Sequence, residues 1–239
     1  MKRIAIQGKI GSFHDIAAHE YFKGEQLQLH CCSTFAEVFD SVRRDPTAIA
    51  MLAIENTIAG SLLHNYDLLR ESETTVVGEQ RLHIQHCICC LPDDDWDTVT
   101  EVHSHPVALM QCRSFLAQHS GIKILEDSIE DNKHNFTRFL VVCHPQKAGN
   151  LCPLEKADKA SIVFSLPHEE GSLSKVLTIL SFYDINLTKI QSLPVIGHEW
   201  EYLFYVDVTF NNLTRYRQAV DAITPLVKSI KILGEYRES

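Results

Sequence analysis

Strand-like and helix-like patterns alternate along the first part of the chain, and this alternation constrains the fold more than any other feature. Short apolar runs at residues 27–32 and 48–54 are each followed by a segment with helical character. In residues 35–42 the apolar side chains recur at i, i+3, i+4 and i+7, the spacing of an amphipathic helix. The run 48–54 is apolar throughout, which is typical of a strand covered on both faces. The pattern predicts an α/β domain with a largely parallel sheet.

The middle of the chain is predicted to continue this pattern into a second lobe. Residues 75–91 are rich in β-forming side chains and are expected to form a strand that crosses between two lobes. A further strand is expected at 98–103. A helix is expected from Pro106 through His119, with Gly121 ending it.

A stretch rich in Pro, Gly and Lys at residues 144–158 marks the predicted domain boundary. We expect one domain over residues 1–148 and a second over residues 159–239. In the second, the predicted order is strand, helix, strand, strand, helix, strand, which is the ferredoxin-like βαββαβ motif. By analogy of fold, a small C-terminal domain of this kind is more often regulatory than catalytic.

The net charge and the cysteines limit which partners this protein can bind and in which cellular compartment it is expected. The 239 residues carry a net charge of −9, which argues against nucleic acid as a partner, because phosphate binding needs a basic surface. No apolar run is long enough to span a bilayer, and residues 1–8 read as a strand and turn rather than a signal peptide. The eight cysteines include adjacent pairs in apolar runs. They predict reduced thiols and a cytoplasmic protein without membrane association.

Polar residues follow the apolar run 48–54 where a ligand would be expected. Glu55, Asn56 and Thr57 come at its end, before a helix that starts near Gly60. Open α/β sheets bind ligands at the carboxyl ends of strands. A plain Asx turn and helix cap would explain the same residues equally well, so both interpretations stay open. Ser12, after Gly11, also starts a helix, whose free N–H groups could meet an anion.

The run 135–142 is a predicted strand that two neighbouring polar residues interrupt. Since side chains alternate along a strand, Thr137 should share a face with Phe139, and Arg138 should face the other way. An ordinary core strand whose hydroxyl and guanidinium find local partners would also fit. Taken alone, this stretch favours that ordinary interpretation.

Metal and nucleophile chemistry find little support in the sequence. Cys87 and Cys90 have Cys-x-x-Cys spacing, but the sequence has no second such pair to complete a four-ligand zinc site. A strand would also turn the two thiols to opposite faces. A Cys/His nucleophile pair stays open, although no cysteine starts a helix in a polar setting. No glycine-rich phosphate loop is present. We therefore expect no metal and no cofactor. The remaining polar candidates are Ser12, Asn56, Thr57, Ser104, Gln111 and Thr137, with Arg138 as the one charged neighbour.

Four ordered motifs and the C-terminal part carry a resemblance to a known family. The motifs are Gly11-Ser12-Phe13, Ile54-Glu55-Asn56-Thr57 with Gly60-Ser61, Ser104-His105-Pro106 with Gln111-Cys112, and Asn135-Phe136-Thr137-Arg138-Phe139. In order and content they resemble prephenate dehydratase. The C-terminal residues Glu170-Gly171-Ser172-Leu173 and Ile185-Asn186-Leu187-Thr188 resemble the ACT domain fused to that enzyme. The resemblance implies a two-lobed catalytic domain like the type II periplasmic binding proteins, followed by an ACT domain that binds L-phenylalanine as feedback inhibitor.

The resemblance also implies an activity and a set of functional residues. The activity is the cofactor-free conversion of prephenate to phenylpyruvate in L-phenylalanine biosynthesis, by loss of carbon dioxide and hydroxide. Thr137 would be catalytic, with Asn56 and Gln111 assisting. Substrate binding would fall to Ser12, Thr57, Ser104, Arg138 and Phe139. Effector binding would fall to Gly171, Ser172, Leu173, Asn186 and Leu187. A homodimer or homotetramer is expected.

The sequence departs from the family pattern in three places. Gly121 leads almost directly to Asn135, so a substantial segment of the second lobe is absent. Val107 stands where a glutamine is expected, and Gln191-Ser192-Leu193-Pro194 where Glu-Ser-Arg-Pro is usual. The alternative hypothesis is therefore a non-catalytic phenylalanine sensor derived from the enzyme. A two-lobed receptor for small anions would need a signal peptide.

Overall fold

The computed structural model describes residues 1–94, 98–104, 106–118, 132, 134–195, 197 and 201–239. Its strands are β1 Lys2–Gln7, β2 Leu27–Cys32, β3 Ile49–Asn56, β4 Gly60–Ser61, β5 Thr75–His83, β6 Phe136–Cys143, β7 Lys159–Ser165, β8 Asn186–Pro194, β9 Tyr202–Thr209 and β10 Ser229–Tyr236. Its α-helices are α1 Phe13–Tyr21, α2 Phe35–Arg44, α3 Leu63–Glu71, α4 Pro106–Gln111, α5 Arg113–Gln118, α6 Pro145–Leu151, α7 Ser172–Phe182 and α8 Leu213–Ile223. The 3₁₀ helices η1 and η2 cover Leu154–Lys156 and Thr224–Leu226.

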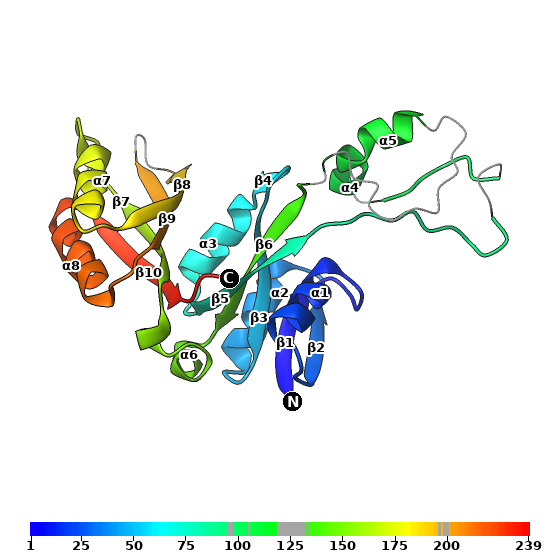
Figure 1. The fold of residues 1–239 in the computed structure, drawn as a ribbon, viewed down its shortest axis with the longest axis horizontal. Helices are drawn as coiled ribbons and strands as arrows, with labels where there is room; N and C mark the ends of the chain where they lie inside the picture. The colour runs from blue at the N-terminus through cyan, green and yellow to red at the C-terminus, as the bar shows by residue number, and fades with distance from the viewer. Residues whose placement is uncertain (95–97, 105, 119–131, 133, 196, 198–200) are drawn as a thin grey trace.

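One mixed sheet runs through the described chain in the order β2-β1-β3-β6-β5-β10-β7-β9-β8, with β4 paired to β3 (Figure 1). The prediction of a largely parallel sheet is wrong. β1 is parallel to β2 and β3, but β6 is antiparallel to both β3 and β5. The chain leaves the sheet along β5 toward α4 and α5 and returns along β6 (Figure 1), so β6 runs against β5, and it also pairs antiparallel with β3.

Two apolar clusters cover the two faces of the first half of the sheet. On one face α1 packs with Ile49, Met51, Phe139 and Val141. On the other, α2 and α3 pack with alternate residues of the same strands, among them Leu52 and Leu140. Residues 49–54 of β3 are apolar because both faces of the strand are covered there, as predicted for the run 48–54.

The C-terminal half has its own core beneath α7 and α8. The helices pack on one face of β7 and β9, and the strand order β10-β7-β9-β8 is antiparallel throughout. This order and the chain sequence β7-α7-β8-β9-α8-β10 are those of the ferredoxin-like motif. Pro225 ends α8 in a 3₁₀ turn, since proline cannot continue the helix.

The predicted domain boundary is not an extended linker. Residues 145–151 form α6, and its Ala148 and Leu151 pack on the core beneath α1. The two halves of the sheet are also joined directly, because β5 and β10 pair in parallel at Val76 and Gly234. The division into domains 1–148 and 159–239 stays a prediction.

Part of the expected second lobe has a different structure from the prediction. Residues 84–94 and 98–104 form no strand, and the expected helix is interrupted at Cys112, between α4 and α5. A strand is stable only beside a partner, and the described residues place none next to these segments. None of the helices in the described ranges has the length and apolarity to cross a membrane.

Candidate active site

Asn56 and Thr137 meet at the ends of two paired strands. They are register partners on β3 and β6, and Asn56 Nδ2 donates to Thr137 Oγ1 over 3.0 Å. The same amide nitrogen donates to Asn135 Oδ1 at 2.7 Å and to the carbonyl oxygen of Phe136 at 3.2 Å. Asn56 is buried, whereas Thr137 is half-buried.

The turn after β3 fixes which way the Asn56 amide points. Asn56 Oδ1 accepts hydrogen bonds from the backbone N–H groups of Ile58 and Ala59, at 2.9 and 2.8 Å. A backbone N–H can only donate, so this atom must be the oxygen and Nδ2 must face Thr137. The Asx turn considered for this stretch is thus present, and it orients the amide.

Gln111 and Asn135 extend this arrangement into a closed set of amides. Gln111 Nε2 donates to Asn56 Oδ1 at 3.2 Å, which leaves Gln111 Oε1 to accept from Asn135 Nδ2 at 3.0 Å. His86 Nε2 lies 2.7 Å from the same oxygen and must therefore carry a proton. We call Asn56, Gln111, Asn135 and Thr137 the amide cluster. The structure brings together all three residues expected to be catalytic.

Asn135 and His86 were not predicted as site residues. Asn135 is fully buried directly before a strand, where a buried amide without a partner would be costly. Its place at the head of the motif Asn135-Phe136-Thr137-Arg138-Phe139 is the signal that sequence reasoning could have used. His86 lies in residues 84–94, whose predicted strand does not form, so its side-chain direction could not be read from alternation.

The structure places three of the expected substrate-binding residues in other roles. Thr57 Oγ1 accepts from the backbone N–H of Phe136 at 2.9 Å and donates to the carbonyl oxygen of His134 at 2.7 Å. Phe139 is buried in the core beneath α1. Ser12 caps α1, accepting from the N–H of Asp15, whose carboxylate accepts from the N–H of Gly11 at 2.7 Å. This helix start already faces a carboxylate of its own.

Arg138 points away from the amide cluster, as strand alternation predicts, and its expected role in substrate binding needs correction. Its guanidinium is buried and donates to Glu55 at 2.5 Å, Glu79 at 3.1 Å and Asp207 at 2.5 Å. Burial alone would raise the pKa of Glu55, but Arg138 and Lys189 together hold that pKa below its usual value. With three carboxylates around it, Arg138 binds within the protein rather than to a substrate carboxylate.

Comparison with known proteins now identifies the family. The sequence model of prephenate dehydratase matches residues 4–123. The chain belongs to the prephenate dehydratase family. The bifunctional chorismate mutase/prephenate dehydratase of Escherichia coli K12 is 28% identical over 274 aligned positions, covering 98% of this chain and 70% of the relative. Arogenate dehydratase/prephenate dehydratase 6 of Arabidopsis thaliana is 30% identical over 289 positions, covering 98% and 68%.

Both alignments are longer than the 239 residues of this chain, so the relatives carry residues that this family member lacks. Among solved structures, GqqA, described as a novel type of quorum quenching acylase, has a TM-score of 0.85 and 25% identity, covering 100% of this chain and 98% of GqqA. Prephenate dehydratase from Arthrobacter aurescens in complex with L-Phe has a TM-score of 0.83 and 20% identity, covering 98% and 90%.

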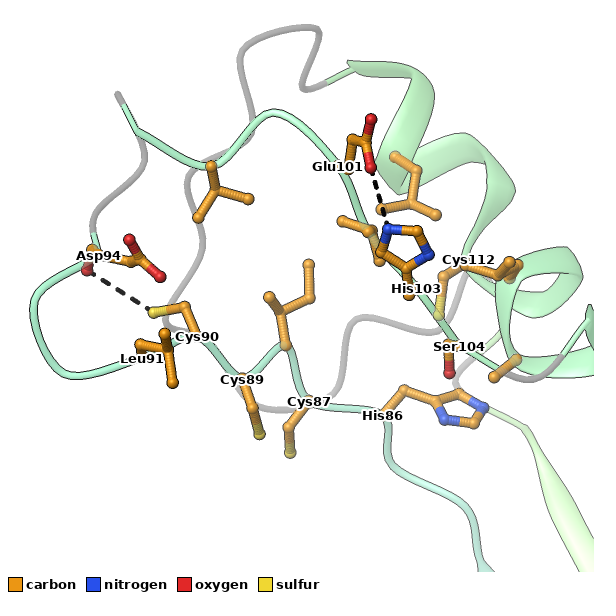
Figure 2. A pocket seen from close by; sticks show the side chains of 16 residues that line it. His86, Cys87, Cys89, Cys90, Leu91, Asp94, Glu101, His103, Ser104 and Cys112 are labelled. Carbon is orange, nitrogen blue, oxygen red and sulfur yellow. Dashed lines mark hydrogen bonds and ion pairs between the residues drawn. The ribbon is translucent and has the colours of Figure 1, made fainter.

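The segments between β5 and β6 in this prephenate dehydratase family member line a hollow of about 610 Å³ (Figure 2). Its lining is mostly apolar and includes Cys87, Cys89, Cys90 and Cys112. Figure 2 shows His86 and the exposed Ser104 at the end opposite Cys90 and Asp94. Because His86 also bonds to Gln111, the hollow adjoins the amide cluster. Within the described residues, no three His, Cys, Asp or Glu side chains are placed to hold a metal ion.

The expected effector residues lie in two places, at the start of α7 and at the start of β8. Gly171 caps α7 with a φ of 76°, a conformation that favours glycine. Leu173 and Leu187 pack on the C-terminal core, and Asn186 Nδ2 donates to Thr209 Oγ1 at 3.4 Å. Their predicted role in binding an effector stays a prediction.

Proposed function

We propose that this chain converts prephenate to phenylpyruvate and that Thr137 is its catalytic residue, assisted by Asn56 and Gln111. The hydrogen bond from Asn56 Nδ2 to Thr137 Oγ1 is the observation that carries this proposal. That bond occupies a lone pair of the hydroxyl oxygen, so the hydroxyl proton is left to point toward a substrate.

This geometry matches the difficult step of the reaction. Loss of carbon dioxide and the ring hydroxyl makes prephenate aromatic, so the product supplies the driving force. The barrier lies in the departure of hydroxide, which a donor held at the leaving oxygen lowers. A threonine hydroxyl is a weak acid, and we therefore assign it the role of a positioned donor. Ser104, exposed beside the hollow, is our candidate for a contact to the substrate.

We further propose that residues 1–148 form a two-lobed catalytic domain and residues 159–239 an ACT domain that binds L-phenylalanine. The ferredoxin-like order of the C-terminal strands and the complex of a structurally similar dehydratase with L-Phe support this proposal. Gly171, Ser172, Leu173, Asn186 and Leu187 are the proposed effector contacts. ACT domains commonly pair edge to edge, so we expect a homo-oligomer, and we propose a cytoplasmic location.

Turnover of prephenate by the purified chain, followed as phenylpyruvate absorbance in alkali, tests the activity. Calorimetry with L-phenylalanine tests the effector site in the same preparation. Turnover that L-phenylalanine lowers supports both proposals. Binding of L-phenylalanine without turnover would overturn the activity and favour a sensor.

A second candidate activity is acyl transfer to water. It is favoured by the likeness to GqqA together with the apolar hollow beside His86, which could hold an acyl chain. A panel of fluorogenic acyl amides of increasing chain length tests it. Release of the fluorophore at a rate that grows with the length of the acyl chain, and that is lost in Gln111→Ala, would support this activity. No release of the fluorophore would exclude the activity for acyl amides.

A further inference from the structure

A buried ion cluster lies between the strands of the amide cluster and the C-terminal sheet. Arg138 is held by Glu55, Glu79 and Asp207, as described above. Lys189 pairs with Glu55, and Lys159 pairs with Glu79 at 2.8 Å. We call Glu55, Glu79, Arg138, Lys159, Lys189 and Asp207 the Arg138 cluster.

The Arg138 cluster draws its members from both halves of the sheet. Glu55, Glu79 and Arg138 lie on β3, β5 and β6, whereas Lys159, Lys189 and Asp207 lie on β7, β8 and β9. Arg138, Glu79 and Asp207 are each buried, so their charges depend mainly on their ionic partners within the cluster for compensation. A buried ion is tolerated only when its partners stay in place, and the cluster therefore ties β3 and β6 to the C-terminal strands.

The Arg138 cluster is coupled to the amide cluster because both have residues on β3 and β6. Glu55 pairs in register with Arg138, and the next pair is Asn56 with Thr137. One pair faces the Arg138 cluster and the other faces the amide cluster, so each strand carries adjacent residues of both. A shift of β3 against β6 that moves Arg138 must also change the distance between Asn56 and Thr137.

We propose that Asp207 and Lys189, on the C-terminal strands, are positioning residues for the Thr137 hydroxyl, acting through Arg138 and Glu55. The turnover part of this inference rests on the proposed function. Asp207 binds the guanidinium of Arg138, and Lys189 binds the carboxylate of Glu55 and the hydroxyl of Ser61 at 3.1 Å. The C-terminal sheet thereby sets the geometry of the donor in the catalytic half.

Tyr205 offers a matched control on the same strand and face as Asp207. Its hydroxyl donates to Asp67 Oδ1 and accepts from Arg70 Nε, both at 3.2 Å, so it also crosses between the two halves. Its partners lie on α3 and not on β3 or β6. Tyr205→Phe thus removes a polar contact across the same boundary without touching the Arg138 cluster.

The test compares Asp207→Asn with Tyr205→Phe in the full chain. Asp207→Asn keeps an oxygen for Ser161, which donates to Asp207 Oδ1 at 2.6 Å, but loses the charge that holds Arg138. We expect Asp207→Asn to lower kcat by about tenfold to about 10²-fold with KM nearly unchanged, since misplacing a reacting group by an ångström has effects of this size. Tyr205→Phe should leave kcat within about twofold of wild type. Equal kcat in the two variants at equal Tm would overturn the proposal.

A second measurement does not depend on turnover. In NMR spectra, the side-chain amide resonances of Asn56 can be assigned by their loss in Asn56→Asp. Their chemical shifts should change in Asp207→Asn and stay unchanged in Tyr205→Phe. If the wild-type chain shows no turnover, the proposed function fails, while these resonances still decide the positioning role. Should Asp207→Asn not fold, Lys189→Met is the substitute, and unmoved Asn56 resonances in it would overturn the inference.

Discussion

Asn56 and Thr137 are register partners on antiparallel strands, and the amide nitrogen of Asn56 donates to the hydroxyl oxygen of Thr137 over 3.0 Å. Two backbone N–H groups, of Ile58 and Ala59, fix the orientation of that amide. The orientation of the amide that meets the Thr137 hydroxyl is therefore set by the turn after β3. In the proposed reaction, a donor preorganised in this way would need no rearrangement.

Removal of the Thr137 hydroxyl should abolish turnover without unfolding the protein. Thr137 is half-buried, and Asn56 Nδ2 keeps Asn135 Oδ1 and the Phe136 carbonyl oxygen as acceptors, so Thr137→Ala should keep the Tm close to that of wild type. We expect kcat to fall by about 10²-fold to about 10⁴-fold, the usual contribution of a positioned proton donor. Thr137→Ser keeps the hydroxyl and is the control. A Thr137→Ala variant with the kcat of Thr137→Ser would contradict the assignment.

Asn56→Asp separates the two functions of the Asn56 side chain. One carboxylate oxygen can still accept from the N–H groups of Ile58 and Ala59, so the turn should form. The other oxygen cannot donate to Thr137, and it also faces Asn135 Oδ1 and the carbonyl oxygen of Phe136. We expect kcat to fall by about 10²-fold or more at neutral pH. Steady-state kinetics and circular dichroism check this, and an intact fold with unchanged kcat would contradict it.

Strand faces could be predicted from the sequence, whereas strand directions could not. Alternation along residues 136–142 correctly placed Thr137 and Arg138 on opposite faces, because a pleated strand has a strict period of two. Apolar periodicity located α2, and the continuous apolar run 48–54 located the buried part of β3. The antiparallel direction of β6 depends on the path of the chain between β5 and β6, which local patterns do not encode.

The hydrogen-bond and ion-pair partners of the site residues were harder to predict than the site residues themselves. The catalytic roles of Asn56, Gln111 and Thr137 were inferred from a resemblance, and their hydrogen bonds required the fold. Asp207 lies 69 residues from Arg138 in the chain, and no local pattern links a guanidinium to a carboxylate at that separation. The expected strand at 98–103 failed for a related reason, since its sequence favours a strand but supplies no partner for it.

Gly234 allows the two halves of the sheet to pair. A Cβ at this position would lie 2.2 Å from the carbonyl oxygen of Val76 and 2.7 Å from its nitrogen. Gly234→Ala must therefore push β10 away from β5, and we expect it to lower the free energy of unfolding by about 1–3 kcal/mol or more. Denaturant unfolding measures this change.

Gly149→Ala is the matched control for Gly234→Ala. Gly149 lies within α6, and a Cβ there would meet nothing within 4 Å. Alanine favours a helix over glycine, so this variant should gain up to about 1 kcal/mol. A Gly234→Ala variant as stable as Gly149→Ala would show that β5 and β10 are not in close contact.

His14 should make the protein less stable in mild acid. Its ring is buried between Phe35 and Phe139, and its Nε2 accepts a hydrogen bond from the N–H of Ala53 at 3.3 Å, which requires the neutral form. Burial lowers the pKa of His14 from 6.5 to about 4. Between these values the unfolded chain binds a proton at His14 that the folded protein does not. The free energy of unfolding therefore falls as the pH drops from 6.5 toward 4, by up to about 3 kcal/mol from this residue.

His14→Gln separates this contribution from those of the other ionisable groups. Glutamine can accept from the N–H of Ala53 through its side-chain oxygen and does not titrate. Denaturant unfolding of wild type and His14→Gln between about pH 7 and about pH 4 gives the comparison. We expect the two stability curves to converge as the pH falls, because only the wild type loses stability through His14. Parallel curves over this range would mean that His14 is protonated as readily in the folded protein as in the unfolded chain.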